Sequence, residues 1–274
     1  MTTVLAPGKL MIVGEYAVLD GAPAIVLAVD RGVRCVRTDA PNLHIETPTG
    51  DDRFVRPAVS GTTGTYQFSN WNPTNLPDKP GFGGSAAACV AACISAGRPA
   101  TDAISLHHKI QGGGSGVDVA ASIHGGMIKV HQGVVTPLTP LIPVVIWSGK
   151  SASTQPLVTQ YLTAKNRSAF VSASTDIVNA FSDNPIEMLH ENGQLLMHMG
   201  VETGVKYMTP TLAGIRKLAR EFGGAAKPSG AGGGDCAIAL FPDTDSTQAF
   251  ISACEERGRT VIPIKVAGPA AVAG

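Results

Sequence analysis

Residues 79–92 read Lys-Pro-Gly-Phe-Gly-Gly-Ser-Ala-Ala-Ala-Cys-Val-Ala-Ala, a glycine-rich loop that runs directly into a series of helix-forming residues. Glycine has no Cβ, so such a loop lets backbone N–H groups approach an anion closely. The helix that we expect from Ser85 to about Ala96 adds a partial positive charge and unpaired N–H groups at its start. The segment therefore predicts a phosphate-binding site at the N-terminus of this helix.

Two further glycine-rich loops follow in the sequence. Residues 112–118 read Gly-Gly-Gly-Ser-Gly-Val-Asp, and residues 227–235 read Lys-Pro-Ser-Gly-Ala-Gly-Gly-Gly-Asp. The Walker A pattern GxxxxGK[ST] is absent, and no acidic residue follows at the spacing of a Rossmann GxGxxG unit. A single glycine loop before a helix is often only a turn, but three loops, two of them with Lys-Pro, predict a common anionic ligand.

Charged residues in and near these loops are candidates for catalysis. Asp118 is the only carboxylate in the first two loops, and the spacing Ser115-x-x-Asp118 is also typical of a helix capping box, with Asp118 at the third helical position. Lys9 enters an apolar strand, where its charge needs a partner. Glu15 in the following turn is a candidate for that partner or, alternatively, for a magnesium ligand.

The composition limits the class of protein. The chain has 274 residues, 44% of them apolar and 15% charged, with 21 basic and 21 acidic residues. The balanced charge gives no electrostatic footprint for nucleic acid or an anionic membrane. The five cysteines form no CxxC pair, no run of 18 apolar residues occurs, and the first residues do not resemble a signal peptide. We expect a soluble, cytoplasmic protein, monomeric or homodimeric, without bound transition metal.

Strand-like and helix-like segments alternate without a strict βαβ rhythm, which favours an α+β fold. Residues 40–80 are polar and proline-rich, with only short strand-like stretches and no helical period. A boundary near residues 137–143 predicts two units, 1–138 and 139–274. The expected strands include 11–13, 24–29, 127–130, 141–147, 235–241 and 260–266; the expected helices are 85–96, 101–108, 115–124, 186–199, 209–222 and 245–256.

Three stretches resemble, in order, the three motifs of the GHMP small-molecule kinases: residues 6–19 (Ala-Pro-Gly-Lys-Leu-Met-Ile-Val-Gly-Glu-Tyr-Ala-Val-Leu), residues 80–87 and residues 227–235. Within that superfamily the sequence is most similar to phosphomevalonate kinases, on residues 114–126, 147–154 and 229–240. The resemblance implies a two-domain α+β fold, with a ribosomal S5 domain 2-like N-terminal half and a ferredoxin-like C-terminal half. It also implies that ATP binds between the halves.

The resemblance further implies roles for matching residues. Lys9 and Asp118 would be catalytic, and magnesium would lie near Ser85 and Glu15. The ATP phosphates would bind the first loop, at Gly81, Gly83, Gly84, Ser85 and Ala86. The acceptor phosphomevalonate would contact Lys9, Ser115, Ser151, Ser153, Ser229 and Gly230.

One position departs from the family pattern, because Gly84 stands where these kinases usually carry another serine. Three alternatives to a phosphomevalonate kinase remain: a mevalonate kinase-like alcohol phosphotransferase, a diphosphomevalonate decarboxylase, and a non-catalytic nucleotide-binding module. The acceptor decides what Asp118 must do. A monophosphate is mostly ionised at pH 7 and needs no general base, whereas an alcohol would benefit from one. For a phosphate acceptor we therefore expect Lys9 to contribute more to the rate than Asp118.

Overall fold

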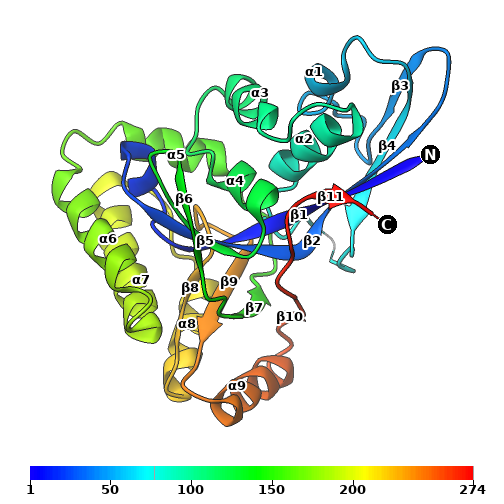
Figure 1. The fold of residues 1–274 in the computed structure, drawn as a ribbon. Coiled ribbons are helices and arrows are strands. Elements are labelled where there is room, and N and C mark those ends of the chain that lie inside the picture. Colours follow the sequence, from blue (N-terminus) through cyan, green and yellow to red (C-terminus); the bar gives the residue numbers. More distant parts are fainter. Residues whose placement is uncertain (77, 274) are drawn as a thin grey trace.

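The computed structural model describes residues 1–76 and 78–273, and these residues form two β-sheets with helices around them (Figure 1). The first sheet has strand order β11-β1-β2-β4-β3, and the β5–β6 hairpin joins it alongside β2. Its strands are antiparallel neighbours except for the parallel pair β3–β4. In chain order they are β1 (Thr2–Val13), β2 (Ala24–Thr38), β3 (Leu43–Glu46), β4 (Gly64–Trp71), β5 (Met127–His131), β6 (Val134–Leu138) and β11 (Ala271–Val272).

Residues 6–13 of β1 and 24–29 of β2 are buried on both faces, which explains why these stretches are mostly apolar, whereas the second half of β2 is partly exposed. Met11 and Val26 pack against α4 (Val117–His124), while Leu10 and Leu27 face the second half of the chain. Because side chains alternate along a strand, Lys9 lies on the same side of β1 as Met11. The strand thus directs Lys9 toward α4.

Three helices cover the outer part of the first sheet and lie together at the top of Figure 1. They are α1 (Arg56–Val59), α2 (Gly84–Ser95) and α3 (Asp102–Gln111). The alanine-rich α2 packs against Val4, Ala6 and Val33 of β1 and β2. Small side chains let this helix approach the strands closely, so the start of α2 is held beside β1.

The second sheet has strand order β10-β7-β9-β8 and is antiparallel throughout. Helices α8 (Pro210–Glu221) and α9 (Thr244–Glu256) cover one face, against which Leu212, Ile215 and Leu218 of α8 form an apolar stripe. Its strands are β7 (Val144–Trp147), β8 (Ala225–Pro228), β9 (Cys236–Leu240) and β10 (Val261–Ile262). This order, with helical segments between β7 and β8 and between β9 and β10, is the ferredoxin-like arrangement expected from the resemblance.

The two halves share one core. Leu10 and Leu27 from the first sheet pack in a cluster with Phe181, Leu189 and Ile238 from the second half. Helices α6 and α7, which lie side by side at the left of Figure 1, contribute to this cluster. The helices between β7 and β8, besides α8, are α5 (Thr154–Leu162), α6 (Ser168–Ala180) and α7 (Pro185–Thr203).

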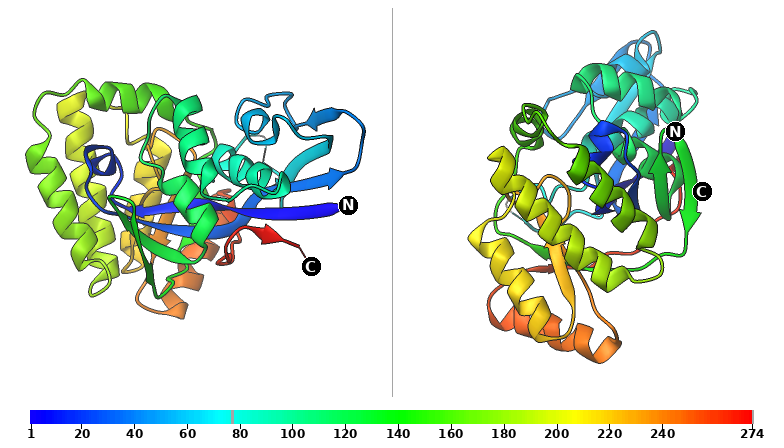
Figure 2. Two further views of the ribbon diagram at one scale, coloured as in Figure 1. Left: turned by 45° about the horizontal axis from the view of Figure 1, so that its top comes forward. Right: turned by 90° about the vertical axis from the view of Figure 1, so that its left-hand side faces the viewer.

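The end of the chain returns to the first sheet. Val266 forms a bridge with Val29, and β11 pairs with β1 at Val4 and Val272, so the two labelled ends lie near each other (Figure 2). Strands β6 and β7 lie on either side of the predicted boundary at 138/139. Strand β11, however, falls in the predicted unit 139–274 and yet belongs to the first sheet. Residue 274 itself lies outside the described part of the chain.

Several predicted elements differ from the observed ones. The strand expected over 260–266 is limited to β10, and the helix expected from Ser115 begins at Val117. Helix α1 lies in the region 40–80, where we expected none, and α5 and α6 were not predicted. Within residues 1–76 and 78–273, no helix has the length and apolar character needed to cross a membrane.

Candidate active site

The first glycine loop, residues 79–85, lies directly against strand β1. The Lys9 backbone N–H donates to the Phe82 carbonyl at 2.9 Å. A Cβ on Gly8 would come within 2.5 Å of the same carbonyl oxygen, so only glycine permits this contact. The loop and Lys9 are therefore held in a fixed relation before any ligand binds.

Lys9 and Asp118 meet beside the start of two helices. The Lys9 Nζ lies 3.4 Å from Asp118 Oδ1, with 11% of the Lys9 side chain and 36% of the Asp118 side chain exposed. Asp118 is the second residue of α4, and Gly83 is the N-cap of α2 with φ of 70°. A Cβ on Gly83 would lie 3.2 Å from Asp118 Oδ2, so the two helix N-termini converge on this ion pair.

The third glycine loop, residues 227–235, reaches the same place from the second half of the chain. A Cβ on Gly230 would lie 3.9 Å from Lys9 Nζ, and one on Gly81 would collide with the Asp235 carboxylate. Ser229 Oγ accepts from the Met11 N–H at 2.9 Å and donates to the Met11 carbonyl at 3.1 Å. The three loops thus converge around Lys9, as their composition predicts.

The segment 147–154 borders these loops. Ser151 Oγ donates to the Lys79 carbonyl at 2.7 Å, and the Ala152 N–H donates to Asp235 Oδ1 at 2.9 Å. Burial raises the pKa of Asp235, although the Ala152 N–H and Lys9 act in the opposite direction. Ser153 is the exposed N-cap of α5. Ser151 and Ser153 therefore lie on the segment that joins the glycine loops to α5.

Glu15 is neither the partner of Lys9 nor placed to hold a metal ion, which corrects both alternatives for this residue. Its carboxylate pairs with the Lys227 ammonium, and both side chains are almost completely buried. Lys227 also donates to the Pro228 carbonyl at 2.9 Å, and the Gly230 N–H donates to Glu15 Oε1 at 3.4 Å. This carboxylate is neutralised by Lys227 and is only 2% exposed at the side chain, so the structure gives no support for it as a magnesium ligand.

One further expectation needs correction, and one predicted site serine has a structural role. The capping box does not form, because Gly116 is the N-cap of α4 and Ser115 accepts only from the Val117 N–H, at 3.5 Å. Asp118 is consequently the second helical residue, and its carboxylate forms an ion pair with Lys9. The Ser229 hydroxyl has both its proton and an acceptor position engaged by Met11, so its observed role is to attach the third loop to β1.

His107 belongs to the site and was not among the predicted residues. It is buried on α3, and its Nε2 lies 3.2 Å from the Ser85 hydroxyl oxygen. Burial lowers the pKa of His107, partly opposed by the Asp118 carboxylate. The available signal was its spacing from Ala103, since residues four apart share one helix face and both are buried.

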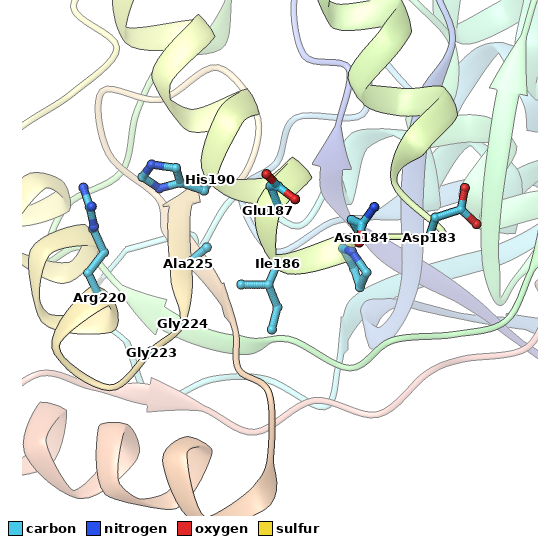
Figure 3. Close-up of a pocket in the computed structure, with 10 residues that line it drawn as sticks. Asp183, Asn184, Ile186, Glu187, His190, Arg220, Gly223, Gly224 and Ala225 are labelled. Atoms are coloured by element: carbon cyan, nitrogen blue, oxygen red, sulfur yellow. The ribbon is translucent and has the colours of Figure 1, made fainter.

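A separate hollow of about 570 Å³ lies away from the glycine loops, between the start of α7 and the end of α8 (Figure 3). Its lining includes Asp183, Glu187, His190 and Arg220, whose side chains Figure 3 shows spread along the rim rather than pointing at one position. This mixed-charge hollow contains none of the predicted site residues.

Comparison with known proteins shows similarity to the GHMP kinases. Residues 180–260 match the family model described as GHMP kinases C terminal. A phosphomevalonate kinase from Streptomyces sp. (strain CL190) is 29% identical, over 86% of this chain and 88% of the relative. A mevalonate kinase from Thermococcus sibiricus is 25% identical, over 89% of this chain and 90% of the relative.

Solved structures agree with these sequence matches. The crystal structure of a Lin0012 protein from Listeria innocua has a TM-score of 0.85 and 26% identity, covering 99% of both chains. The Streptococcus pneumoniae phosphomevalonate kinase in complex with phosphomevalonate and AMPPNP has the same fold, with a TM-score of 0.78 at 19% identity, covering 97% of this chain and 100% of that one. The resemblance to the GHMP kinase superfamily is therefore confirmed, and the homologues indicate a kinase, that is, a phosphotransferase.

Proposed function

We propose that this GHMP kinase-like protein transfers the γ-phosphoryl group of ATP to 5-phosphomevalonate, giving 5-diphosphomevalonate and ADP. The observation that supports the proposal is the convergence of two helix N-termini, Lys9 and the third glycine loop around one position. Two helix starts and an ammonium group provide positive charge from three directions. Such a site suits a reaction between two anions, ATP and a phosphorylated acceptor.

The ATP phosphates would bind at the start of α2. Gly84 and Ser85 are the first two residues of this helix and are exposed. A Cβ on Gly84 would meet nothing within 4 Å, so the space in front of the helix is open although the usual serine hydroxyl is missing. Gly81, Gly83 and Ala86 would complete the loop that surrounds the phosphates.

Lys9 and Asp118 would act on the transferring group and the acceptor. Phosphoryl transfer depends mainly on positioning and on neutralisation of charge. Lys9 would bind phosphate oxygens of both substrates and so reduce their repulsion. Asp118 would hold Lys9 in place and orient the acceptor, because a phosphate acceptor that is already ionised loses no proton.

Magnesium fits this site with few protein ligands. Mg²⁺ usually keeps several waters and binds one or two carboxylates together with substrate phosphates. The Ser85 hydroxyl and the Asp118 carboxylate are the oxygen atoms that fit, since both lie at the helix starts and neither is deeply buried. When bound, the ion would neutralise charge on the ATP phosphates.

The acceptor phosphate would be recognised by the segment 147–154, through Ser151, Ser153 and Lys150, with Ser115 and Gly230 on the opposite side. Two hydrogen bonds donated by this segment, to the Lys79 carbonyl and to the Asp235 carboxylate, link it to the first and third loops. A second candidate is a mevalonate kinase-like alcohol phosphotransferase. Similarity to the mevalonate kinase from Thermococcus sibiricus over 89% of the chain favours it.

An acceptor screen tests the proposed function. ADP release from ATP is measured with mevalonate, phosphomevalonate and diphosphomevalonate as separate acceptors, together with carbon dioxide release. We expect turnover with phosphomevalonate at a kcat/KM at least tenfold above that with mevalonate. Preference for mevalonate would replace the proposal with the second candidate, and carbon dioxide release would indicate a decarboxylase.

A further inference from the structure

A hydrogen bond joins the start of α2 to a buried ring on the neighbouring helix. Ser85 is exposed at the second position of α2, and its hydroxyl lies 3.2 Å from Nε2 of His107 on α3. Ser85 is the only side-chain hydroxyl in the loop of residues 79–85. His107 therefore contacts the one side chain of this loop that can offer a hydroxyl to a phosphate group.

The imidazole ring of His107 is itself fixed. It stacks on the Phe54 ring, with centroids 4.9 Å apart and planes 30° apart, and it is buried on the inner face of α3. An exposed serine hydroxyl ordinarily samples three staggered rotamers. A hydrogen bond to this packed ring favours one of them, and the tautomer with the proton on Nε2 donates to Ser85 Oγ and leaves the hydroxyl proton free for a phosphate oxygen.

We propose that His107 is a positioning residue for the nucleotide, which holds the Ser85 hydroxyl in the orientation that binds the ATP phosphates. The proposal rests on the proposed function, because it takes the start of α2 as the phosphate site. A group ordered before binding loses less conformational entropy when the ligand arrives. Since one neutral hydrogen bond is involved, we expect its loss to weaken ATP binding about 3- to 10-fold.

Three substitutions of His107 separate the hydrogen bond from packing. His107→Leu removes every polar atom, His107→Asn keeps an amide that is too short to reach Ser85, and His107→Gln carries an amide that reaches the Nε2 position. The same changes to Asn and Gln at His108, the exposed neighbour on α3, are matched controls. Ser85→Ala, alone and combined with His107→Leu and with His107→Asn, completes the double-mutant cycles.

ATP affinity is measured by calorimetry without acceptor, and KM and kcat are measured with the preferred acceptor. We expect His107→Leu and His107→Asn to weaken ATP binding and raise the KM for ATP, with the acceptor KM and kcat within about twofold of the parent. His107→Gln should restore affinity, the His108 variants should bind ATP normally, and the Ser85→Ala background should remove most of the effect.

The proposal is overturned if His107→Asn binds ATP as the parent does, if His107→Gln is as weak as His107→Asn, or if the losses with Ser85→Ala are additive. Should His107→Leu fail to fold, the comparison of Asn with Gln and the His107→Asn cycle decide alone. A parent protein that binds ATP but phosphorylates none of the three acceptors would contradict the proposed function, while the binding cycle would still test His107.

Discussion

Two lysine–carboxylate pairs flank Gly230 and differ in their access to solvent. Lys227 and Glu15 are 0% and 2% exposed at the side chain, whereas Lys9 and Asp118 are 11% and 36% exposed. Burial raises the pKa of Glu15 and lowers the pKa of Lys227, and the attraction between the two groups opposes both shifts. The buried pair is closed to solvent, with Glu15 Oε1 held by Lys227 and Gly230 and Oε2 without a hydrogen-bond partner, while the open pair can exchange partners with a ligand.

A lysine beside a glycine loop can therefore serve either the stability of the fold or the binding of a ligand. Both lysines have a proline and a glycine nearby in the sequence. Each is paired with a carboxylate, because a charged group in an apolar setting needs a partner of opposite charge. Only the depth of the pair distinguishes a group that stabilises the fold from one that can bind substrate. Variants of the two pairs should therefore affect different measurements.

The largest effect on stability should come from Lys227→Met. Removal of one partner leaves Glu15 buried without compensation, which typically costs about 3–5 kcal/mol. Urea unfolding of the variant and the parent gives the free energy difference. Lys227→Met combined with Glu15→Leu should recover most of it, and a single variant that loses less than about 1 kcal/mol would contradict the structural role.

The largest effect on the reaction should come from Lys9→Met. On the proposed function, loss of the ammonium group that would face the transferring phosphoryl group should lower kcat about 10²- to 10³-fold. The unfolding free energy should change by less than about 1 kcal/mol, because Asp118 remains in contact with solvent. Steady-state kinetics and urea unfolding of the same preparation test both statements, and a stability loss equal to that of Lys227→Met would remove the distinction between the pairs.

Asp118→Asn should have a smaller effect than Lys9→Met, about tenfold in kcat, because the carboxylate would orient rather than remove a proton. Kinetics with phosphomevalonate and with mevalonate as acceptors provide the measurement. A loss as large as that of Lys9→Met would indicate a general base and therefore an alcohol acceptor.

A third ion pair, between the partly buried side chains of Asp20 and Arg167, sharpens the comparison. Asp20 accepts from Arg167 at 2.7 and 2.9 Å and from the Tyr161 hydroxyl at 2.5 Å. These hydrogen bonds, above all those from Arg167, lower the pKa of Asp20 in the folded protein. The stabilisation is therefore complete above the unfolded pKa of about 3.9 and is lost as the pH falls through the lower folded value.

Asp20→Asn should thus reduce the unfolding free energy by about 1 kcal/mol at pH 7, a figure that allows for solvent screening. The difference from the parent should shrink as the pH falls below about 4. Urea titrations at pH 7, 5 and 3 measure this dependence. A difference that is constant across the series would mean that the carboxylate charge contributes nothing.

The helices with a clear local signal could be predicted from the sequence. The alanine run after the first loop gives α2, and the stripe of Leu212, Ile215 and Leu218 gives α8, each ending at glycine. Helices α5 and α6 could not be found in this way. Proline lies in the first turn of α5, and α6 is rich in serine and threonine, which are weak helix formers.

The sequence could predict which loops form the candidate site, but not which side chains contact one another there. Glycine composition identified the three loops, because close backbone approach to an anion requires that residue type. The choice of Asp118 for Lys9 and of Lys227 for Glu15 depends on how strands and helices from distant parts of the chain meet. His107 had only its position on a helix face as a signal, since its partner Ser85 lies on another helix.

The pairing of β11 with β1 has a consequence for biosynthesis. Val4 and Leu5 are register partners of Val272 and Ala271, so this part of the edge of β1 stays unpaired until residues 271–272 have been synthesised. On the ribosome this edge has unpaired backbone groups and invites association with other nascent chains. Lys9 thus lies on a strand with one neighbour, β2, that follows it directly in the chain and another, β11, that is synthesised after all the other strands described.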